Sequence, residues 1–326
     1  MFLGIEIGGT KLQLGLGRGD GVISALWRGT VNPSEGSDGI RRQIEAAVPE
    51  LLTRANLHRS ALRGVGVGFG GPVDDATRTV IKSHQIAGWD GFPLAEWVSD
   101  LVGVPAVLAN DADVAGLAEA LFGAGKGMSP VFYITVGTGV GGGLIVDGEI
   151  YRGVGRGAAE IGHLRIPAVA EFPHVLHLSL ELFASGQAIR HEAERYRLQG
   201  GSDLTAILRH TEDDSISSEA VACAAREGDD LAIRIIQQAD SALAEGICHV
   251  IALLCPRRIV IGGGVSLMGE DLFFEPLRRM VHERVFAPFR GLTDIVPAAL
   301  GEEVVVHGAL ALVQRRQAEH GARTGQ

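Results

Sequence analysis

One pattern occurs twice in this chain: an apolar, strand-forming run, a turn of glycine and threonine, and a second strand-forming run. The first copy spans residues 3–17 (LGIEIGGTKLQLGLG) and the second spans residues 131–146 (VFYITVGTGVGGGLIV). Two apolar runs joined by a short glycine turn are typical of a β-hairpin. The sequence therefore predicts two hairpins, with Gly8-Gly9-Thr10 and Gly137-Thr138-Gly139 at their tips.

A glycine tip lets the backbone come close to an anion, so that its N–H groups point at phosphate oxygens. Two such tips, one in each half of the chain, indicate a nucleoside triphosphate bound in a cleft between two related domains. Glu6 precedes the first turn, and Lys11 follows it. A carboxylate at this place could hold Mg²⁺, directly or through water, because Mg²⁺ prefers oxygen ligands beside phosphates. An exposed glutamate on the outward side of a strand fits the same pattern.

Length and composition narrow the class of protein. At 326 residues, two domains are expected, and 46% hydrophobic with 21% charged residues is ordinary for a globular protein. The formal charge of −10 argues against nucleic acid or an anionic membrane as the main partner. Three cysteines, no signal-peptide pattern and no run long enough to span a membrane predict a cytoplasmic protein.

Helical and strand patterns alternate along the chain, which predicts an α/β fold with a largely parallel part in its sheets. A strand over residues 104–108 leads into a helix over residues 112–121. The glycine-rich stretch at 123–127 then marks a domain boundary. We expect an N-terminal α/β domain over residues 1–122 and a C-terminal α/β domain over residues 123–306.

Asn110 and Asp111 stand where that strand meets the helix. Both residue types are good N-caps, and capping alone would explain one of them. The other interpretation is a general base, because the helix dipole favours the ionised form of Asp111. The local sequence leaves both possibilities open.

Two further segments have a composition suited to ligands. Glu160 and His163 lie in a glycine-rich stretch, and such groups suit the recognition of sugar hydroxyls, although a lone histidine in such a place is more often structural. Gly262-Gly263-Gly264 follows an apolar strand and permits close approach of the backbone to a flat ligand such as adenine.

Taken in order, six segments resemble the ROK family of sugar kinases and sugar-responsive repressors, within the actin/hexokinase/heat-shock-chaperone superfamily. They are EIGGTK (6–11), LANDADVAGLAE (108–119), VGTGVGGG (136–143), AAEIGH (158–163), LSLELFASG (178–186) and IVIGGGVS (259–266). The resemblance implies two ribonuclease-H-like (actin-like ATPase) domains with an inter-domain cleft. It also implies a C-terminal helix over residues 307–318 that completes the first domain, and a homodimer.

The resemblance further implies a phosphotransferase of the hexokinase/glucokinase type that moves the γ-phosphoryl group of ATP to a hydroxyl of a glucose-like or fructose-like hexose. Asp111 would be the general base, and Glu6 would position Mg²⁺ through water. The sugar would be held by Asn110, Asp111, Glu160, His163 and Glu181, the phosphates by Gly8, Gly9, Thr10, Lys11, Gly137, Thr138 and Gly139, and the adenosine by Gly262, Gly263 and Gly264. A non-catalytic sugar sensor and a polyphosphate donor are the alternatives.

The chain departs from the family pattern at several positions. Glu6 replaces the usual aspartate, Ala159 replaces a glycine, and Gln85-Ile86-Ala87-Gly88-Trp89 replaces Asn-Leu-Pro-Gly-Trp. The family's cysteine zinc cluster is missing, because residues 164–180 contain no cysteine and Ser179 stands at the last cysteine position. A thiolate-bound structural zinc is therefore not expected here. A metal bound by His163, His174 and His177 with Glu171 is left as an alternative.

Overall fold

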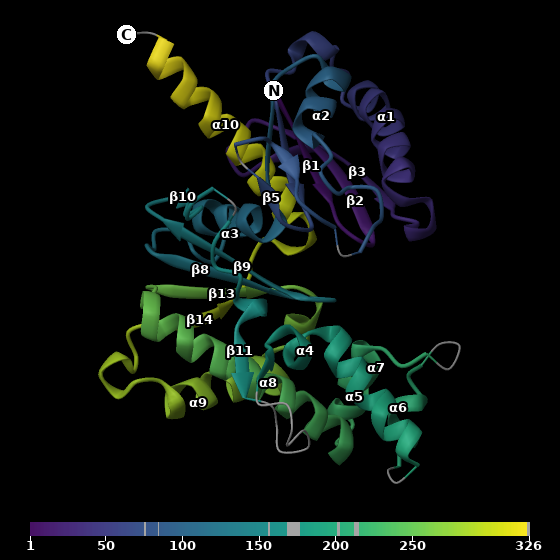
Figure 1. The fold of residues 1–326 in the computed structure, drawn as a ribbon, viewed down its shortest axis with the longest axis vertical. Coiled ribbons are helices and arrows are strands. Elements are labelled where there is room, and N and C mark those ends of the chain that lie inside the picture. The colour runs from purple at the N-terminus through teal and green to yellow at the C-terminus, as the bar shows by residue number, and fades with distance from the viewer. Residues whose placement is uncertain are drawn as a thin grey trace. The chain divides into compact units, whose positions relative to one another are not determined.

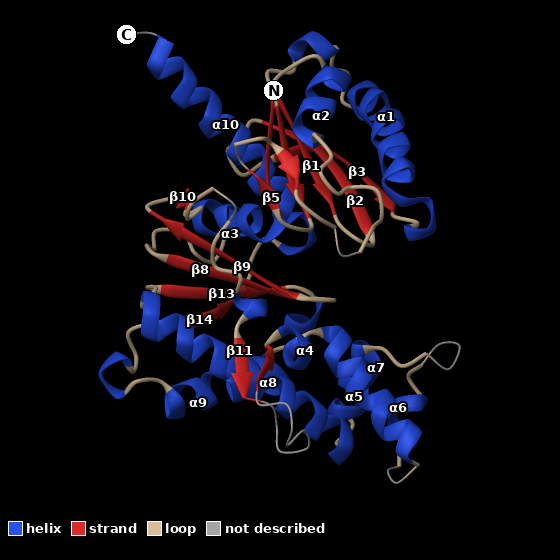
Figure 2. Cartoon of the chain, in the orientation of Figure 1, coloured by secondary structure: helices blue, strands red, loops and turns tan. Residues whose placement is uncertain are grey.

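The computed structural model describes residues 1–74, 76–83, 85–155, 157–167, 177–200, 203–211 and 215–324. The chain forms two compact units, each with its own internal contacts. Unit 1 comprises Met1–Gly127, Gly143–Ala158 and Ala299–Gln326, and unit 2 comprises Met128–Gly142 and Ala159–Ala298. Figure 1 gives the order of the elements along the chain, and Figure 2 distinguishes helices from strands.

The first sheet has five strands in the order β3-β2-β1-β4-β7. Its strands are β1 (Phe2–Ile7), β2 (Lys11–Gly17), β3 (Ile23–Thr30), β4 (Val65–Phe69) and β7 (Ala106–Asn110). The first three form an antiparallel meander, whereas β4 and β7 run parallel to β1. The predicted first hairpin is therefore confirmed, and its glycine turn lies between β1 and β2.

The two faces of this sheet carry side chains of different size. Large residues such as Leu3, Ile5 and Val67 belong to the buried core that also includes apolar residues of α1 (Gly36–Arg54) and α2 (Leu94–Val102). Because successive strand residues point to opposite faces, the glycines that alternate with them line the other face. A Cβ atom at Gly66 would lie only 1.9 Å from the carbonyl oxygen of Ala309, so glycine is needed for this close approach.

The helix on that glycine-lined face is α10 (Val304–Thr324), which also packs against α3 (Asp111–Phe122). Val306, Leu310 and Val313 of α10 form a buried apolar cluster with Phe2 of β1. Residues from the two ends of the sequence thus share one core within unit 1.

The second sheet also has five strands, in the order β10-β9-β8-β13-β14. These strands are β8 (Val131–Val136), β9 (Val140–Val146), β10 (Glu149–Ile150), β13 (Arg258–Gly262) and β14 (Asp294–Pro297). Strand β13 runs parallel to both β8 and β14. Two mixed five-stranded sheets with helices between their strands confirm the predicted α/β class.

Most helices of unit 2 follow one another after the second hairpin. They are α4 (Glu181–Ala184), α5 (Gly186–Gln199), α6 (Thr205–Leu208), α7 (Ser218–Arg226), α8 (Asp230–Leu254) and α9 (Glu275–Arg284). Two short ribbons, β5 (Val73–Asp74) with β6 (Thr79–Val80) and β11 (Arg165–Pro167) with β12 (His177–Ser179), complete the described strands. Within the described ranges, no helix has both the length and the apolar composition needed to cross a membrane.

Candidate active site

The first glycine turn is held closely to the strands around it. The amide of Gly8 donates to the carbonyl of Lys11 over 3.0 Å, which closes the turn between β1 and β2. The amide of Val31 donates to the carbonyl of Thr10 over 2.9 Å, which ties the turn to the chain that leaves β3. The turn is therefore fixed at the end of β1, next to the start of β2.

Glu6 lies in β1 directly before this turn, and only 4% of the residue is exposed. The alternative of an exposed glutamate is therefore wrong. Its Oε1 atom is 3.0 Å from the ammonium of Lys11, whereas Oε2 is buried without a hydrogen-bond partner among the described residues. Burial raises the pKa of Glu6 to about 7; Lys11 opposes this shift, and the nearby negative charge of Asp111 adds to it. A buried carboxylate oxygen with no hydrogen bond is a donor that suits Mg²⁺.

Asn110 and Asp111 have different roles at the junction of β7 and α3. Asn110 is the N-cap, because its Oδ1 accepts hydrogen bonds from the amides of Ala112, at 2.8 Å, and Asp113, at 3.4 Å. Its side-chain amide also donates to the carbonyl of Gly71. The capping interpretation is thus confirmed for Asn110. Asp111 is the first residue of the helix, and its Oδ1 accepts from the amide of Ala112 at 2.8 Å.

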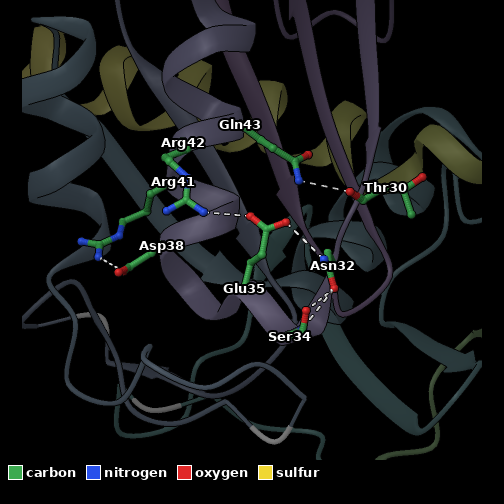
Figure 3. A network of polar contacts seen from close by, with 8 residues as sticks. All are labelled: Thr30, Asn32, Ser34, Glu35, Asp38, Arg41, Arg42 and Gln43. Atoms are coloured by element: carbon green, nitrogen blue, oxygen red, sulfur yellow. Dashed lines mark hydrogen bonds and ion pairs between the residues drawn. The ribbon is translucent and has the colours of Figure 1, made fainter.

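A polar network fixes the loop between β3 and α1 (Figure 3). Asn32 accepts hydrogen bonds from the amide and hydroxyl of Ser34, and its own side-chain amide donates to Glu35. Glu35 in turn pairs with Arg42 at 2.8 Å. The other members shown are Thr30, which accepts from Gln43, and the ion pair of Asp38 with Arg41. The loop between β3 and α1, which begins at Val31 beside the first glycine turn, is therefore held in one conformation by these side chains.

The first turn of α1 holds the Gln85–Trp89 segment of unit 1. The amide of Ser37 donates to the carbonyl of Ala87 at 2.9 Å, and its hydroxyl donates to the carbonyl of Gly88 at 3.0 Å. Gln85 lies directly over the first glycine turn, because a Cβ atom at Gly9 would be 1.5 Å from Gln85 Oε1. No local sequence pattern joins Gln85 to Gly9, so this contact is seen only in the folded chain.

The second glycine turn lies between β8 and β9 in unit 2. The amide of Gly137 donates to the carbonyl of Gly139 at 2.9 Å, and the Gly137 carbonyl accepts from the amide of Gly186 at 2.8 Å. Glu181, the first residue of α4, accepts from the amide of Val140 through Oε2 at 2.9 Å. The structure thus brings Glu181, which was predicted to bind sugar, next to the second predicted phosphate turn.

Glu160 and His163 lie in the same unit as Glu181. Burial raises the pKa of Glu160, the charge of His163 opposes the shift, and the charge of Glu181 adds to it. The three side chains are therefore close enough to interact electrostatically, and His163 is exposed. Ala159 has φ of +64°, a left-handed conformation that favours glycine, which gives the physical reason for the family's usual residue there.

The three glycines at the end of β13, of which Gly262 is its last residue, differ in their surroundings. A Cβ atom at Gly263 would lie 2.5 Å from the carbonyl oxygen of Val136, so this glycine is needed for packing against β8. A Cβ atom at Gly264 would meet nothing within 4 Å. Space for a ligand therefore exists at Gly264, whereas the requirement for glycine at position 263 is structural.

No group of three or more His, Cys, Asp or Glu side chains among the described residues could hold a metal ion. Cys223, Cys248 and Cys255 are all free. Glu171 and His174 lie outside the described residues, and so does the side chain of His177. The alternative metal site with His163 stays a prediction.

Comparison with known proteins gives one consistent family. The sequence pattern of the ROK family matches residues 2–316. The glucokinase of Thermotoga maritima is 30% identical over 326 residues, covering 96% of this chain and 97% of the relative. The glucokinase of Streptomyces coelicolor is 31% identical, covering 96% of this chain and 97% of the relative. A xylose repressor of Caldicellulosiruptor bescii is 26% identical, covering 95% of this chain and 77% of the repressor.

Solved structures agree with these sequence matches. A ROK family glucokinase from Streptomyces griseus, in complex with glucose and AMPPNP, superposes with a TM-score of 0.81 at 31% identity, covering 95% of this chain and 98% of that one. A ROK hexokinase from Thermus thermophilus superposes with a TM-score of 0.77 at 25% identity, covering 97% of this chain and 99% of that one. The two mixed sheets agree with the predicted two-domain, actin-like fold of ROK kinases. The chain therefore belongs to the ROK family.

Proposed function

We propose that this protein transfers the γ-phosphoryl group of ATP to a hydroxyl group of a hexose, with Asp111 as the general base. It is a glucokinase-like sugar kinase, a phosphotransferase with an alcohol as acceptor. The observation that carries the proposal lies within unit 1. A Cβ atom at Gly70 would lie 3.4 Å from Asp111 Oδ2 and 3.6 Å from Gly8 Cα, so the Asp111 carboxylate lies beside the first glycine turn. The proposed proton acceptor and the proposed phosphate-binding turn are therefore neighbours.

Asp111 would take the proton of the attacking sugar hydroxyl. Its place in the first turn of α3 favours the ionised carboxylate, because the helix dipole is positive at that end. Asn110 caps the helix and thereby fixes the backbone that carries Asp111. In phosphoryl transfer, most of the acceleration comes from positioning and charge neutralisation, and the base removes one proton.

Glu6 would hold Mg²⁺ through water. A water molecule bound to the ion would donate a hydrogen bond to the buried Oε2 atom of Glu6, which has no partner among the described residues. Mg²⁺ bound there would neutralise charge on the phosphate oxygens. The glycine turns at Gly8–Thr10 and Gly137–Gly139 would donate backbone N–H groups to the phosphates. Lys11, 3.0 Å from Glu6, would keep the buried carboxylate neutralised when nucleotide is absent.

The sugar hydroxyls would be held by Asn110, Glu160, His163 and Glu181 in addition to Asp111. Glu181 already accepts a hydrogen bond from Val140 through Oε2, so it would contact the sugar through its other oxygen while holding the second turn in place. Gly264 offers the open backbone for adenosine. Binding of sugar would close the two domains, predicted over residues 1–122 and 123–306, and exclude water from the γ-phosphate.

The experiment that tests this function is coupled ADP release with Mg-ATP against glucose, fructose, mannose, the N-acetylhexosamines and cyclitols. We expect turnover that depends on one hexose and disappears in Asp111→Asn. A protein that gains thermal stability with a sugar but shows no turnover would be a sugar sensor instead. The same assay with polyphosphate in place of ATP tests the donor.

A further inference from the structure

A second acidic residue of α3, Glu119, makes an unusual set of hydrogen bonds. Glu119 is fully buried, with 0% of the residue exposed. Its Oε2 atom accepts from the amide of Ala124 at 2.7 Å, and Oε1 accepts from the amides of Ala299 and Leu300, each at 2.9 Å. A buried carboxylate is costly unless both oxygens are hydrogen-bonded, and three backbone donors meet that need here.

These donors come from two stretches that lead to unit 2. Ala124 lies just after α3, shortly before the first part of unit 1 ends at Gly127. Ala299 is the residue at which the chain returns from unit 2 to unit 1. One carboxylate therefore joins two of the places at which the chain passes between the units.

The turn after α3 is shaped around this carboxylate. A Cβ atom at Gly123 would lie 2.0 Å from Glu119 Oε2, so any side chain there would displace the carboxylate. The amides of Gly123 and Gly125 also donate to the backbone carbonyl of Glu119, at 3.1 and 3.0 Å. Both the backbone and the side chain of Glu119 thus hold residues 123–125, shortly before the chain passes to unit 2.

We propose that Glu119 is a positioning residue for the kinase reaction. Its hydrogen bonds join two hinge segments, residues 123–125 and 299–300, so that the two segments move together when sugar binds. The inference rests on the proposed function. Helix α3 carries the proposed base at its first residue and Glu119 in its last turn. A helix is stiff over this length, so a sugar that contacts Asp111 would be coupled through α3 to Glu119 and to the two segments that it bonds.

The test uses the full chain and the isosteric variant Glu119→Gln. A carboxamide has only one acceptor oxygen, so it cannot accept from Ala124 and from Ala299 with Leu300 at once. We expect faster amide hydrogen exchange in one of the two segments. We also expect a smaller sugar-induced compaction in solution scattering, and a kcat about tenfold lower while the sugar KM changes less, because a charged hydrogen bond is lost.

The matched control is Glu149→Gln, which removes a carboxylate of unit 1 that pairs with Arg315 outside the hinge. Glu119→Asp serves if Glu119→Gln does not fold, because it keeps the charge on a shorter stem. Exchange, compaction and kcat equal to those of Glu149→Gln would overturn the hinge role. If the unaltered chain shows no sugar-dependent ADP formation, the proposed function fails. In that case the exchange at Ala124 and Ala299 still decides whether Glu119 fastens them.

Discussion

The ammonium of Lys11 lies 3.0 Å from Glu6 Oε1, so the residue after the first glycine turn neutralises the residue before it. Lys11 also donates to the carbonyl of Glu302 at 3.0 Å, next to the start of α10. The pair is asymmetric, because 40% of the Lys11 side chain is exposed against 6% for Glu6. The carboxylate therefore bears most of the cost of desolvation, and the pKa of Glu6 rises to about 7.

Removing Lys11 should destabilise the protein in a pH-dependent way. The pKa of Glu6 is raised by folding, so its contribution to stability is fully present below the unfolded value of 4.5 and is lost as pH rises through about 7. Lys11→Met should enlarge this loss by about 1 kcal/mol at pH 8 and have little effect at pH 5. Thermal unfolding from pH 5 to pH 9 measures it. In the Glu6→Gln background the effect of Lys11→Met on stability should no longer depend on pH; if it still does, another group is its source.

Asp111→Asn should retain sugar binding and lose catalysis. The amide keeps a hydrogen-bonding group in place but cannot accept the hydroxyl proton, and general-base catalysis contributes roughly 10²–10⁴ in rate. Coupled ADP release should show this loss in kcat, whereas calorimetric titration should show a sugar Kd within about threefold of the unaltered protein. Undiminished kcat in Asp111→Asn would remove Asp111 from the role of base.

Asp240 of α8 should be a source of instability above neutral pH. The residue is 1% exposed, its Oδ2 has no hydrogen-bond partner among the described residues, and burial raises its pKa well above the usual value. Stability from this group is present below the ordinary pKa of aspartate and is lost as pH rises through the raised value. Asp240→Asn should therefore raise Tm at pH 8 by roughly 2–4 °C and by less at pH 5. The exposed Asp100→Asn is the control, and an equal gain at both pH values would contradict the explanation.

Ala159→Gly should stabilise unit 2, although glycine usually costs stability. Ala159 has φ of +64°, where a Cβ atom is strained by about 1 kcal/mol. The free energy gained by relieving this strain should exceed the cost of the extra conformational entropy that glycine gives the unfolded chain. The free energy of unfolding should therefore rise by about 0.5 kcal/mol. Urea unfolding measures the change. Ala158→Gly, next to it but without a positive φ, should destabilise by a similar amount, and the same sign for both variants would disprove the strain.

The features that could be predicted from the sequence are those set by neighbouring residues. The hairpin tips, the cap at Asn110 and the alternation of helices and strands depend on short-range patterns. The contact of Gln85 with Gly9 and the bonds of Glu119 to Ala299 and Leu300, 180 and 181 residues away, depend on the tertiary fold. The burial of Glu6 also had to come from the structure, because a strand pattern does not show what covers its polar positions.

The packing of α10 on β1 and β4 has a consequence for biosynthesis. The strands of the first sheet are made before unit 2, whereas Val306, Leu310 and Val313, which cover its glycine-lined face, are made after all of unit 2. Unit 2 can therefore fold while unit 1 still lacks the helix that covers one face of its sheet. Unit 1 is thus begun before unit 2 and completed after it, so a nascent chain halted before α10 would expose apolar surface to chaperones and proteases.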